Sequence, residues 1–212
     1  MRAGKWQLTD FSMKKSPSQA RSRASVDAMV QAAARILAEQ GYAGLTTNAV
    51  ARVAGVSIGS LYEYFPGKEA IVARLVDDLL AETLTMLHGQ LDLTDNRNDL
   101  AVAMRHFLRA LHGVMRKHRR LLRVLVFQVP YLHQLPATLQ LQRALQDVLQ
   151  RGLEKAQQHY RVSIGPHTLY LMATSTGGSL LHLVLMTPPS MPHEPVIDAL
   201  ADRMVAWLLE GE

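Results

Sequence analysis

The sequence predicts an all-α protein in which a small N-terminal helix-turn-helix domain is joined by a long helix to a C-terminal helical bundle. Apolar residues recur at helical spacing along most of the chain, and no stretch shows the alternation typical of a β-strand. A pair of short helices with glycine at the corner between them lies near the front of the chain. Apolar residues make up 48% of the 212 residues, which is enough for a sizeable core.

Residues 1–23 are predicted to form a basic, disordered leader. This segment carries six basic residues and one acidic residue, and because the whole chain has a net charge of +5, the remainder is close to neutral. Cations gathered just ahead of a helix-turn-helix suit an arm near phosphates. A solvated leader without such contacts is the alternative, and the sequence leaves both open.

Residues 24–70 are predicted to form the helix-turn-helix domain. Its first helix begins near Ser25 and is expected to end at Gly41. A hydroxyl at Thr46 or Thr47 can cap the second helix, because it accepts a hydrogen bond from an unpaired backbone N–H. The corner between the second and third helices is Gly55, since glycine takes a left-handed conformation without steric cost.

The third helix, about residues 58–64, has an unusual composition. Ser57 can cap it, while Leu61 and Phe65 are spaced to point inward. Gly59 and the serine beside it are poor helix formers, and they leave a thin front that can approach another surface closely. Two tyrosine hydroxyls and a following lysine suit the phosphates of a duplex.

The residues that carry a family resemblance are Gly41-Tyr42, Leu45-Thr46-Thr47, Val50-Ala51, Ala54-Gly55-Val56-Ser57, Gly59-Ser60-Leu61-Tyr62, Tyr64-Phe65 and Lys68-Glu69. In order and spacing they resemble the DNA-binding domain of TetR-family transcriptional regulators, over about residues 25–72. The resemblance implies that DNA contacts lie at Thr46, Thr47, Asn48, Ser57, Ile58, Gly59, Ser60, Tyr62, Tyr64 and Lys68. Tyr62 and Tyr64 packing within the small domain is the structural alternative.

Residues 71–212 are predicted to form a ligand-binding and dimerisation bundle. The long helix from Lys68 to about Gly89 enters it, and a break near Leu93–Asn96 follows. Further helices are expected from about Leu100 to Met115, Leu121 to Val129, Pro136 to Tyr160, Thr168 to Thr187, and from Pro195 onward.

Small residues at helical spacing in the last two helices suit close packing between subunits, and TetR-like regulators usually dimerise through these helices. The predicted interface residues are Ala173, Gly177, Gly178, Leu181, Val184, Leu200, Met204 and Leu208. A helix buried within one subunit is the alternative. A two-fold dimer would present two recognition helices about 34–36 Å apart to a palindromic operator.

The resemblance also implies a small effector inside the bundle, and a largely apolar one because no charge stands out as buried. Candidate lining residues are Met104, Phe107, Leu111, Met115, Phe127, Tyr131, Tyr170 and Thr174. Methionine and aromatic stripes are, however, more often ordinary core.

Other classes of function find little support in the sequence. Cysteine is absent, and no His-x-x-x-His pair, glycine-rich phosphate loop or G-x-S-x-G elbow occurs, so no metal, cofactor or catalysis is expected. No secretory signal is visible, and residues 168–187 are too rich in hydroxyl residues for a typical membrane span. We therefore expect a cytoplasmic, ligand-responsive, dimeric repressor. The alternative is a helical ligand-binding or enzymatic module with a vestigial helix-turn-helix.

Overall fold

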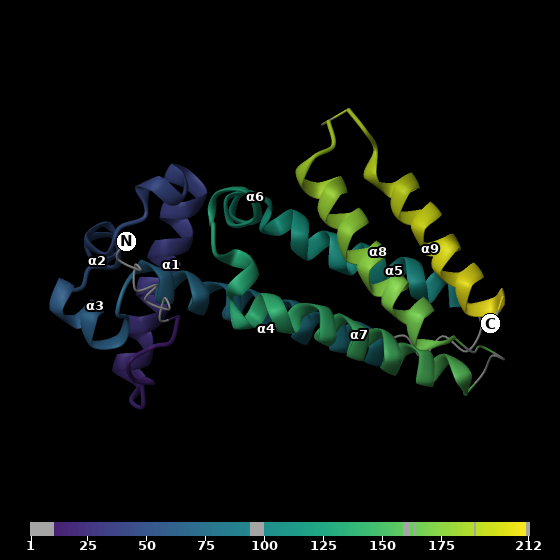
Figure 1. The fold of residues 1–212 in the computed structure, drawn as a ribbon, viewed down its shortest axis with the longest axis horizontal. Helices are drawn as coiled ribbons and strands as arrows, with labels where there is room; N and C mark the ends of the chain where they lie inside the picture. The colour runs from purple at the N-terminus through teal and green to yellow at the C-terminus, as the bar shows by residue number, and fades with distance from the viewer. Residues whose placement is uncertain (1–10, 94–99, 159–161, 163, 189, 211–212) are drawn as a thin grey trace, which may run out of the picture. The chain divides into compact units, whose positions relative to one another are not determined.

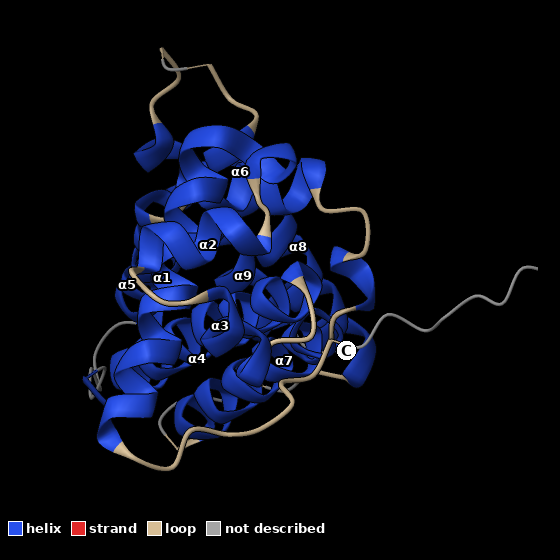
Figure 2. Cartoon of the chain, turned by 90° about the vertical axis from the view of Figure 1, so that its left-hand side faces the viewer, coloured by secondary structure: helices blue, strands red, loops and turns tan. Residues whose placement is uncertain are grey.

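The computed structural model describes residues 11–93, 100–158, 162, 164–188 and 190–210. Within these residues the chain forms helices, turns and loops without a strand (Figure 2), so the predicted all-α class is confirmed. The elements, labelled in Figure 1, are α1 (Ala20–Gly44), α2 (Thr47–Ala54), α3 (Ile58–Tyr64), α4 (Lys68–Leu93), α5 (Leu100–Lys117), α6 (Arg119–Gln128), the 3-10 helix η1 (Leu132–Gln134), α7 (Pro136–Gln157), α8 (Pro166–Leu185) and α9 (His193–Glu210).

The chain divides into two compact units. Unit 1 comprises residues 1–79 and 124–137, and unit 2 comprises residues 80–123 and 138–212. α4, α6 and α7 each contribute residues to both units, so the chain passes between the units within helices. The units differ from the predicted domains because residues 71–79 and 124–137 group with the helix-turn-helix.

The core of unit 1 is built on α1. This helix buries Val26, Met29, Val30, Ala32, Ala33, Ile36 and Leu37. Val50 and Ala51 of α2, Leu61 of α3 and Phe65 just after it are also buried. Burying a large apolar side chain stabilises a fold by about 1.5–3 kcal/mol, so this shared core fixes α2 and α3 on α1.

Both ends of α1 are set by local signals. The helix begins at Ala20, earlier than the expected start at Ser25, with the Gln19 backbone N–H donating to Ser22 Oγ at 3.2 Å. Residues 20–23 are therefore helical, which corrects the disorder predicted for them, and residues 1–10 lie outside the described part of the chain. At Gly41 the backbone leaves helical geometry, with φ 71° and ψ −176°, so the predicted break in the helix is confirmed.

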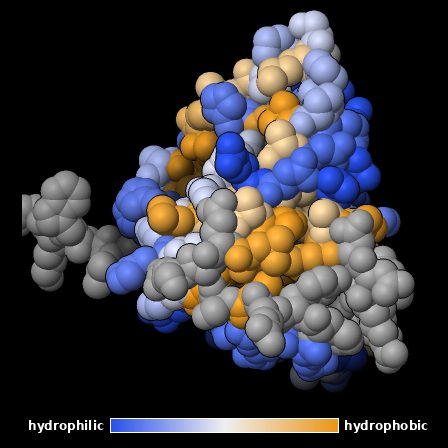
Figure 3. Space-filling model, turned by 90° about the vertical axis from the view of Figure 1, so that its right-hand side faces the viewer, coloured by the Kyte–Doolittle hydropathy of each residue, from blue (hydrophilic) through white to orange (hydrophobic). Residues whose placement is uncertain are grey.

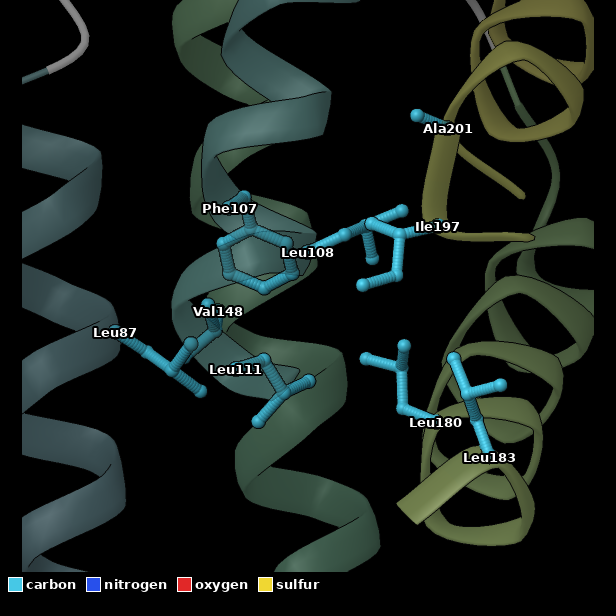
Figure 4. Close-up of a cluster of buried hydrophobic side chains, with 9 residues drawn as sticks. All are labelled: Leu87, Phe107, Leu108, Leu111, Val148, Leu180, Leu183, Ile197 and Ala201. Atoms are coloured by element: carbon cyan, nitrogen blue, oxygen red, sulfur yellow. The ribbon is translucent and has the colours of Figure 1, made fainter. Parts of the chain in front are cut away.

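Unit 2 has a core to which five helices contribute. Figure 4 shows it as a cluster of Leu87, Phe107, Leu108, Leu111, Val148, Leu180, Leu183, Ile197 and Ala201. These side chains come from α4, α5, α7, α8 and α9, which explains why each of those helices carries an apolar stripe.

α8 is the one described helix that is long and apolar enough, by length and composition, to cross a membrane. In unit 2 it packs against α5 and α9 and buries Met172, Ala173, Thr176, Leu180, Leu183, Val184 and Leu185. Leu180 and Leu183 of α8 belong to the core shown in Figure 4.

Several predicted boundaries shift by a few residues. α4 extends to Leu93 instead of ending near Gly89, and α9 begins at His193 instead of Pro195. The chain turns at His118, between α5 and α6, which lies in the gap expected between Met115 and Leu121. The helix expected to run to about Tyr160 ends at Gln157, and Tyr160 itself lies outside the described residues.

Candidate nucleic-acid interface

The start of α2 is fixed by a side-chain cap. Thr46 has extended backbone geometry, and its Oγ1 accepts a hydrogen bond from the backbone N–H of Ala49 at 3.1 Å. Thr46 is thus the capping residue, while Thr47 is the first residue of the helix. The side chain of Thr47 is consequently left for another role.

The corner between α2 and α3 depends on glycine. Gly55 has φ 69° and ψ 30°, the left-handed conformation predicted for it. Its N–H donates to the carbonyl of Arg52 at 3.3 Å, and the N–H of Val56 donates to the carbonyl of Ala51 at 3.0 Å. Together these bonds close the last turn of α2 and direct the chain into α3.

α3 starts on a second side-chain cap. Ser57 Oγ accepts from the backbone N–H of Ser60 at 3.0 Å and lies 2.8 Å from the Ser60 hydroxyl. The predicted cap at Ser57 is therefore present. It commits both serine side chains to each other in the free protein, so a partner must reach them as a hydrogen-bonded pair.

The two sides of α3 differ sharply in exposure. Leu61 and Phe65 are completely buried, as their spacing predicted. Ile58 is 38% exposed and Tyr62 is 43% exposed, and the two lie one helical turn apart. Gly59 is also exposed, and a Cβ on it would meet only Ser57 Oγ, at 3.8 Å. The described residues therefore leave room for a side chain at Gly59.

A hydrogen bond joins the first turn of α2 to α3. The hydroxyls of Thr47 and Tyr62 lie 3.1 Å apart, with either one able to donate. Asn48, the next residue of α2, is exposed. One hydroxyl of the pair donates to the other, so one O–H remains to donate to a phosphate oxygen beside the helix N-terminus.

Tyr64 and Lys68 are engaged within unit 1. Lys15 Nζ lies 4.7 Å from the centroid of the Tyr64 ring. Lys68 is the first residue of α4, and its Nζ lies 4.1 Å from the centroid of the Tyr42 ring. These cation–π contacts fix where both side chains lie, while the positive charge of each lysine is kept.

Sequence reasoning missed a cluster behind the helix-turn-helix that includes residues from the end of α6. The Tyr42 hydroxyl donates to the Tyr131 hydroxyl at 3.3 Å, and the backbone N–H of Tyr42 donates to Gln128 Oε1 at 3.0 Å. The Phe11 ring lies 5.3 Å from the Tyr131 ring. Burial, and then the Tyr42 hydrogen bond, raise the pKa of Tyr131 above its ordinary value, so this hydroxyl stays protonated. No local pattern pairs residues so distant in the sequence.

The predicted dimer residues divide by burial. Ala173, Val184, Met204 and Leu208 are at most 5% exposed within the single chain, so they form its core and not a free surface. Leu200 is half-buried and packs against that core. A Cβ on Gly177 would lie 3.7 Å from Leu145 Cδ1. Of the predicted set, Gly178 is exposed with open space around it, and Leu181 is half-buried.

The eight predicted pocket residues differ in burial, and they are divided between the two units. Phe107 and Leu111 are core residues, and Met104 and Met115 pack against them. Phe127 and Tyr170 are 57% and 47% exposed, while the Thr174 hydroxyl is bonded to the carbonyl of Tyr170 at 2.9 Å. Tyr131 and Phe127 belong to unit 1, whereas the other six belong to unit 2.

An open cleft of about 320 Å³ lies elsewhere in unit 2, and it is lined by Val102, Arg105, His106, Arg109 and Asp198. Its arginines are paired, Arg105 with Asp202 at 2.7 Å and Arg109 with Asp198 at 2.8 Å. None of the predicted pocket residues lines this cleft. Among the residues that the structure describes, no group of three or more His, Cys, Asp or Glu side chains could hold a metal ion.

These features define a class, an all-helical protein with a capped helix-turn-helix whose second helix presents a thin, exposed front. Residues 29–75 match the family model described as bacterial regulatory proteins of the tetR family. The chain therefore has a TetR-family DNA-binding domain, which confirms the resemblance predicted from its motif residues. No curated protein matches the chain in sequence.

Solved structures with this fold cover nearly the whole chain. A TetR-family regulator from Mesorhizobium loti is 19% identical with a TM-score of 0.65, covering 91% of this chain and 98% of its own. The fatty acid degradation regulator FadR from Bacillus halodurans is 18% identical, with a TM-score of 0.62 and coverage of 92% and 97%. PfmR from Thermus thermophilus, a TetR-family regulator, is 20% identical, with a TM-score of 0.61 and coverage of 92% and 98%. At these identities the likeness establishes the fold. The three proteins compared are transcriptional regulators and not enzymes.

Proposed function

We propose that this protein is a dimeric transcriptional repressor of the cytoplasm, which a small, largely apolar effector releases from a palindromic operator. The main support for DNA binding is the exposure of one side of α3. Ile58, Gly59 and Tyr62 are exposed there, while Leu61 and Phe65 anchor the helix from behind. An exposed helix end of this kind fits the major groove of a duplex.

The roles proposed at the interface follow from side-chain chemistry. The Thr47 and Tyr62 hydroxyls are joined by a hydrogen bond of 3.1 Å, and the O–H that this bond leaves free donates to a phosphate. Thr46 and Ser57 serve mainly as caps, which orient the N-terminal N–H groups of α2 and α3 toward the duplex. Asn48, Ile58 and Ser60 lie at the positions proposed to meet base edges, where Ile58 would contact a thymine methyl group.

We propose that dimerisation uses the exposed face of α8 and the end of α9. Gly178 offers open space there, and Leu171 and Leu209 are 54% and 56% exposed. Figure 3, which shows the side that lies at the right in Figure 1, has apolar surface gathered near its centre. The buried residues of the predicted interface act indirectly, by holding these two helices together.

The proposed switch uses α4, which contributes residues to both compact units. An effector that binds unit 2 would favour a dimer whose two recognition helices no longer match successive grooves. A difference of about 1–3 kcal/mol in effector affinity between the two states is enough for a working switch.

Fluorescence anisotropy with the duplex upstream of the gene tests the DNA-binding role. We expect the logarithm of the binding constant to fall linearly with the logarithm of the salt concentration, as phosphate contacts require. Tyr62→Phe removes a hydroxyl that is proposed to bind phosphate, so it should weaken binding to all DNA sequences alike. Ser60→Ala should instead change which DNA sequence the protein prefers. No binding to any duplex at low salt would refute the proposal. Binding that no effector alters would refute the switch alone.

A further inference from the structure

The segment before α1 is anchored to unit 1 at three points. The Phe11 ring packs on Tyr131, and Met13 Sδ accepts a hydrogen bond from Arg74 Nη1 at 3.6 Å. The backbone N–H of Lys14 donates to the carbonyl of Tyr64 at 2.8 Å. These anchors hold residues 11–15 against the helix-turn-helix.

The anchor at Tyr64 acts on the recognition helix itself. α3 has only seven residues, and Tyr64 is its last. The final carbonyls of a helix have no partner within the helix, so the bond from Lys14 satisfies one of them from outside. The segment therefore supports the C-terminal end of α3.

Lys15, the next residue of the segment, offsets the negative charge of α3. The sequence of α3, IGSLYEY, contains one acidic residue, Glu63, and no basic residue. Lys15 Nζ lies 2.8 Å from Glu63 Oε2, and it also lies over the Tyr64 ring. The hydrogen bond to Glu63 raises the pKa of Lys15, so the ammonium stays charged while it neutralises the carboxylate.

Fold stability does not account for this pair. The side chains of Lys15 and Glu63 are 51% and 58% exposed, and an exposed ion pair contributes little to the stability of a fold. An unpaired, exposed carboxylate in α3, however, would be a negative charge on the same short helix that is proposed to bind a duplex. Like charges brought together in an interface are a substantial penalty, because water is partly excluded there.

We infer that residues 11–15 are an integral part of the DNA-binding surface, in which Lys15 is a positioning residue that neutralises Glu63 so that α3 can approach the phosphate backbone. This inference rests on the proposed DNA-binding function. It assigns a role in binding to a segment that precedes the helix-turn-helix. It also predicts that the effect of Lys15 on DNA affinity depends on Glu63.

A double-mutant cycle tests that dependence. Anisotropy titrations use a fluorescein-labelled, random-sequence duplex of about 30 base pairs in low salt, since non-specific binding depends on phosphates. In the full chain, Lys15→Gln should weaken binding about tenfold. In the Glu63→Gln background, the same change should weaken binding by less than about threefold, because no carboxylate remains to be neutralised.

Lys14→Gln is the matched control, because it removes the same charge from the neighbouring residue of the same segment. Its effect on affinity should be equal in the wild-type background and in the Glu63→Gln background. Because these side chains are exposed, all variants should melt within about 4 °C of the wild type, which separates binding from folding.

The outcomes are distinguishable. If the wild type and Glu63→Gln both ignore the duplex, the proposed function fails. If the wild type binds but Lys15→Gln has no effect, or weakens binding equally in both backgrounds, only the role of Lys15 toward Glu63 is overturned. A loss confined to the background that retains Glu63 supports it.

Discussion

Gly59→Ala should separate the stability of the fold from the affinity for DNA. Gly59 is the second residue of α3 and is exposed, and the added methyl group would lie 3.8 Å from Ser57 Oγ, an ordinary contact distance. Alanine favours a helix over glycine by up to about 1 kcal/mol, so the variant should be as stable as the wild type or slightly more stable. At about 2–4 °C for each kcal/mol, the melting temperature should rise by no more than about 4 °C.

The same methyl group stands on the front that is proposed to enter the groove. If the backbone of α3 approaches the duplex closely, the methyl group displaces the helix and weakens the contacts around it. We expect affinity to fall at least tenfold, which corresponds to about 1.4 kcal/mol. Anisotropy measures this loss, and thermal unfolding followed by circular dichroism measures stability.

Two other glycines provide matched controls. Gly113→Ala is also an exposed helix position with open space around it, but it lies in α5, so it should stabilise without changing DNA affinity. Gly55→Ala also meets nothing within 4 Å, yet its φ of 69° makes alanine strained, and stability should fall by about 1–2 kcal/mol. Unchanged DNA affinity in Gly59→Ala would refute the close approach of α3, and an equal loss in Gly113→Ala would show that the effect is not local.

Two further predictions concern unit 2. Gly178→Glu places a charge on the exposed face of α8 where nothing in the chain obstructs it, so sedimentation equilibrium should show monomers with an unchanged fold; a dimer of undiminished affinity would rule this face out. Burial, followed by the charges of His193 and Arg116, lowers the pKa of His112, whose Nε2 lies 2.8 Å from His193 Nδ1. Below about pH 6.5 His112 therefore binds a proton more readily in the unfolded chain than in the folded chain. The free energy of unfolding should decrease as the pH is lowered below about 6.5, and His112 should cause no change above that pH. In His112→Gln this slope should be shallower in urea unfolding between about pH 5 and 7, and an identical slope in both proteins would contradict the assignment.

Local signals were sufficient for the helix-turn-helix. The caps at Thr46 and Ser57 and the left-handed turn at Gly55 each depend on a few neighbouring residues, and the structure has all three. Helical spacing also identified Leu61 and Phe65 as buried. The start of α1 was predicted too late, because the cap formed by Gln19 and Ser22 adds a turn at its beginning.

The predicted dimer and pocket sets show where periodicity stops being informative. An apolar stripe indicates that one side of a helix is covered, but not what covers it. Ala173, Val184, Met204 and Leu208 are covered by their own chain, and Phe107 and Leu111 by the core of unit 2. Phe127, which has an equally apolar side chain, is instead 57% exposed.

By itself, the sequence determined the helical class, the motif at residues 46–65 and its TetR-family resemblance, because short-range backbone preferences and spacing are written in consecutive residues. Only the tertiary structure decided that Lys15 meets Glu63, that Tyr42 meets Gln128 and Tyr131, and which apolar stripes lie inside the chain. Those pairings join residues as many as 89 positions apart. They depend on how the helices pack, and the free energy of packing is shared among many weak contacts that no local pattern specifies.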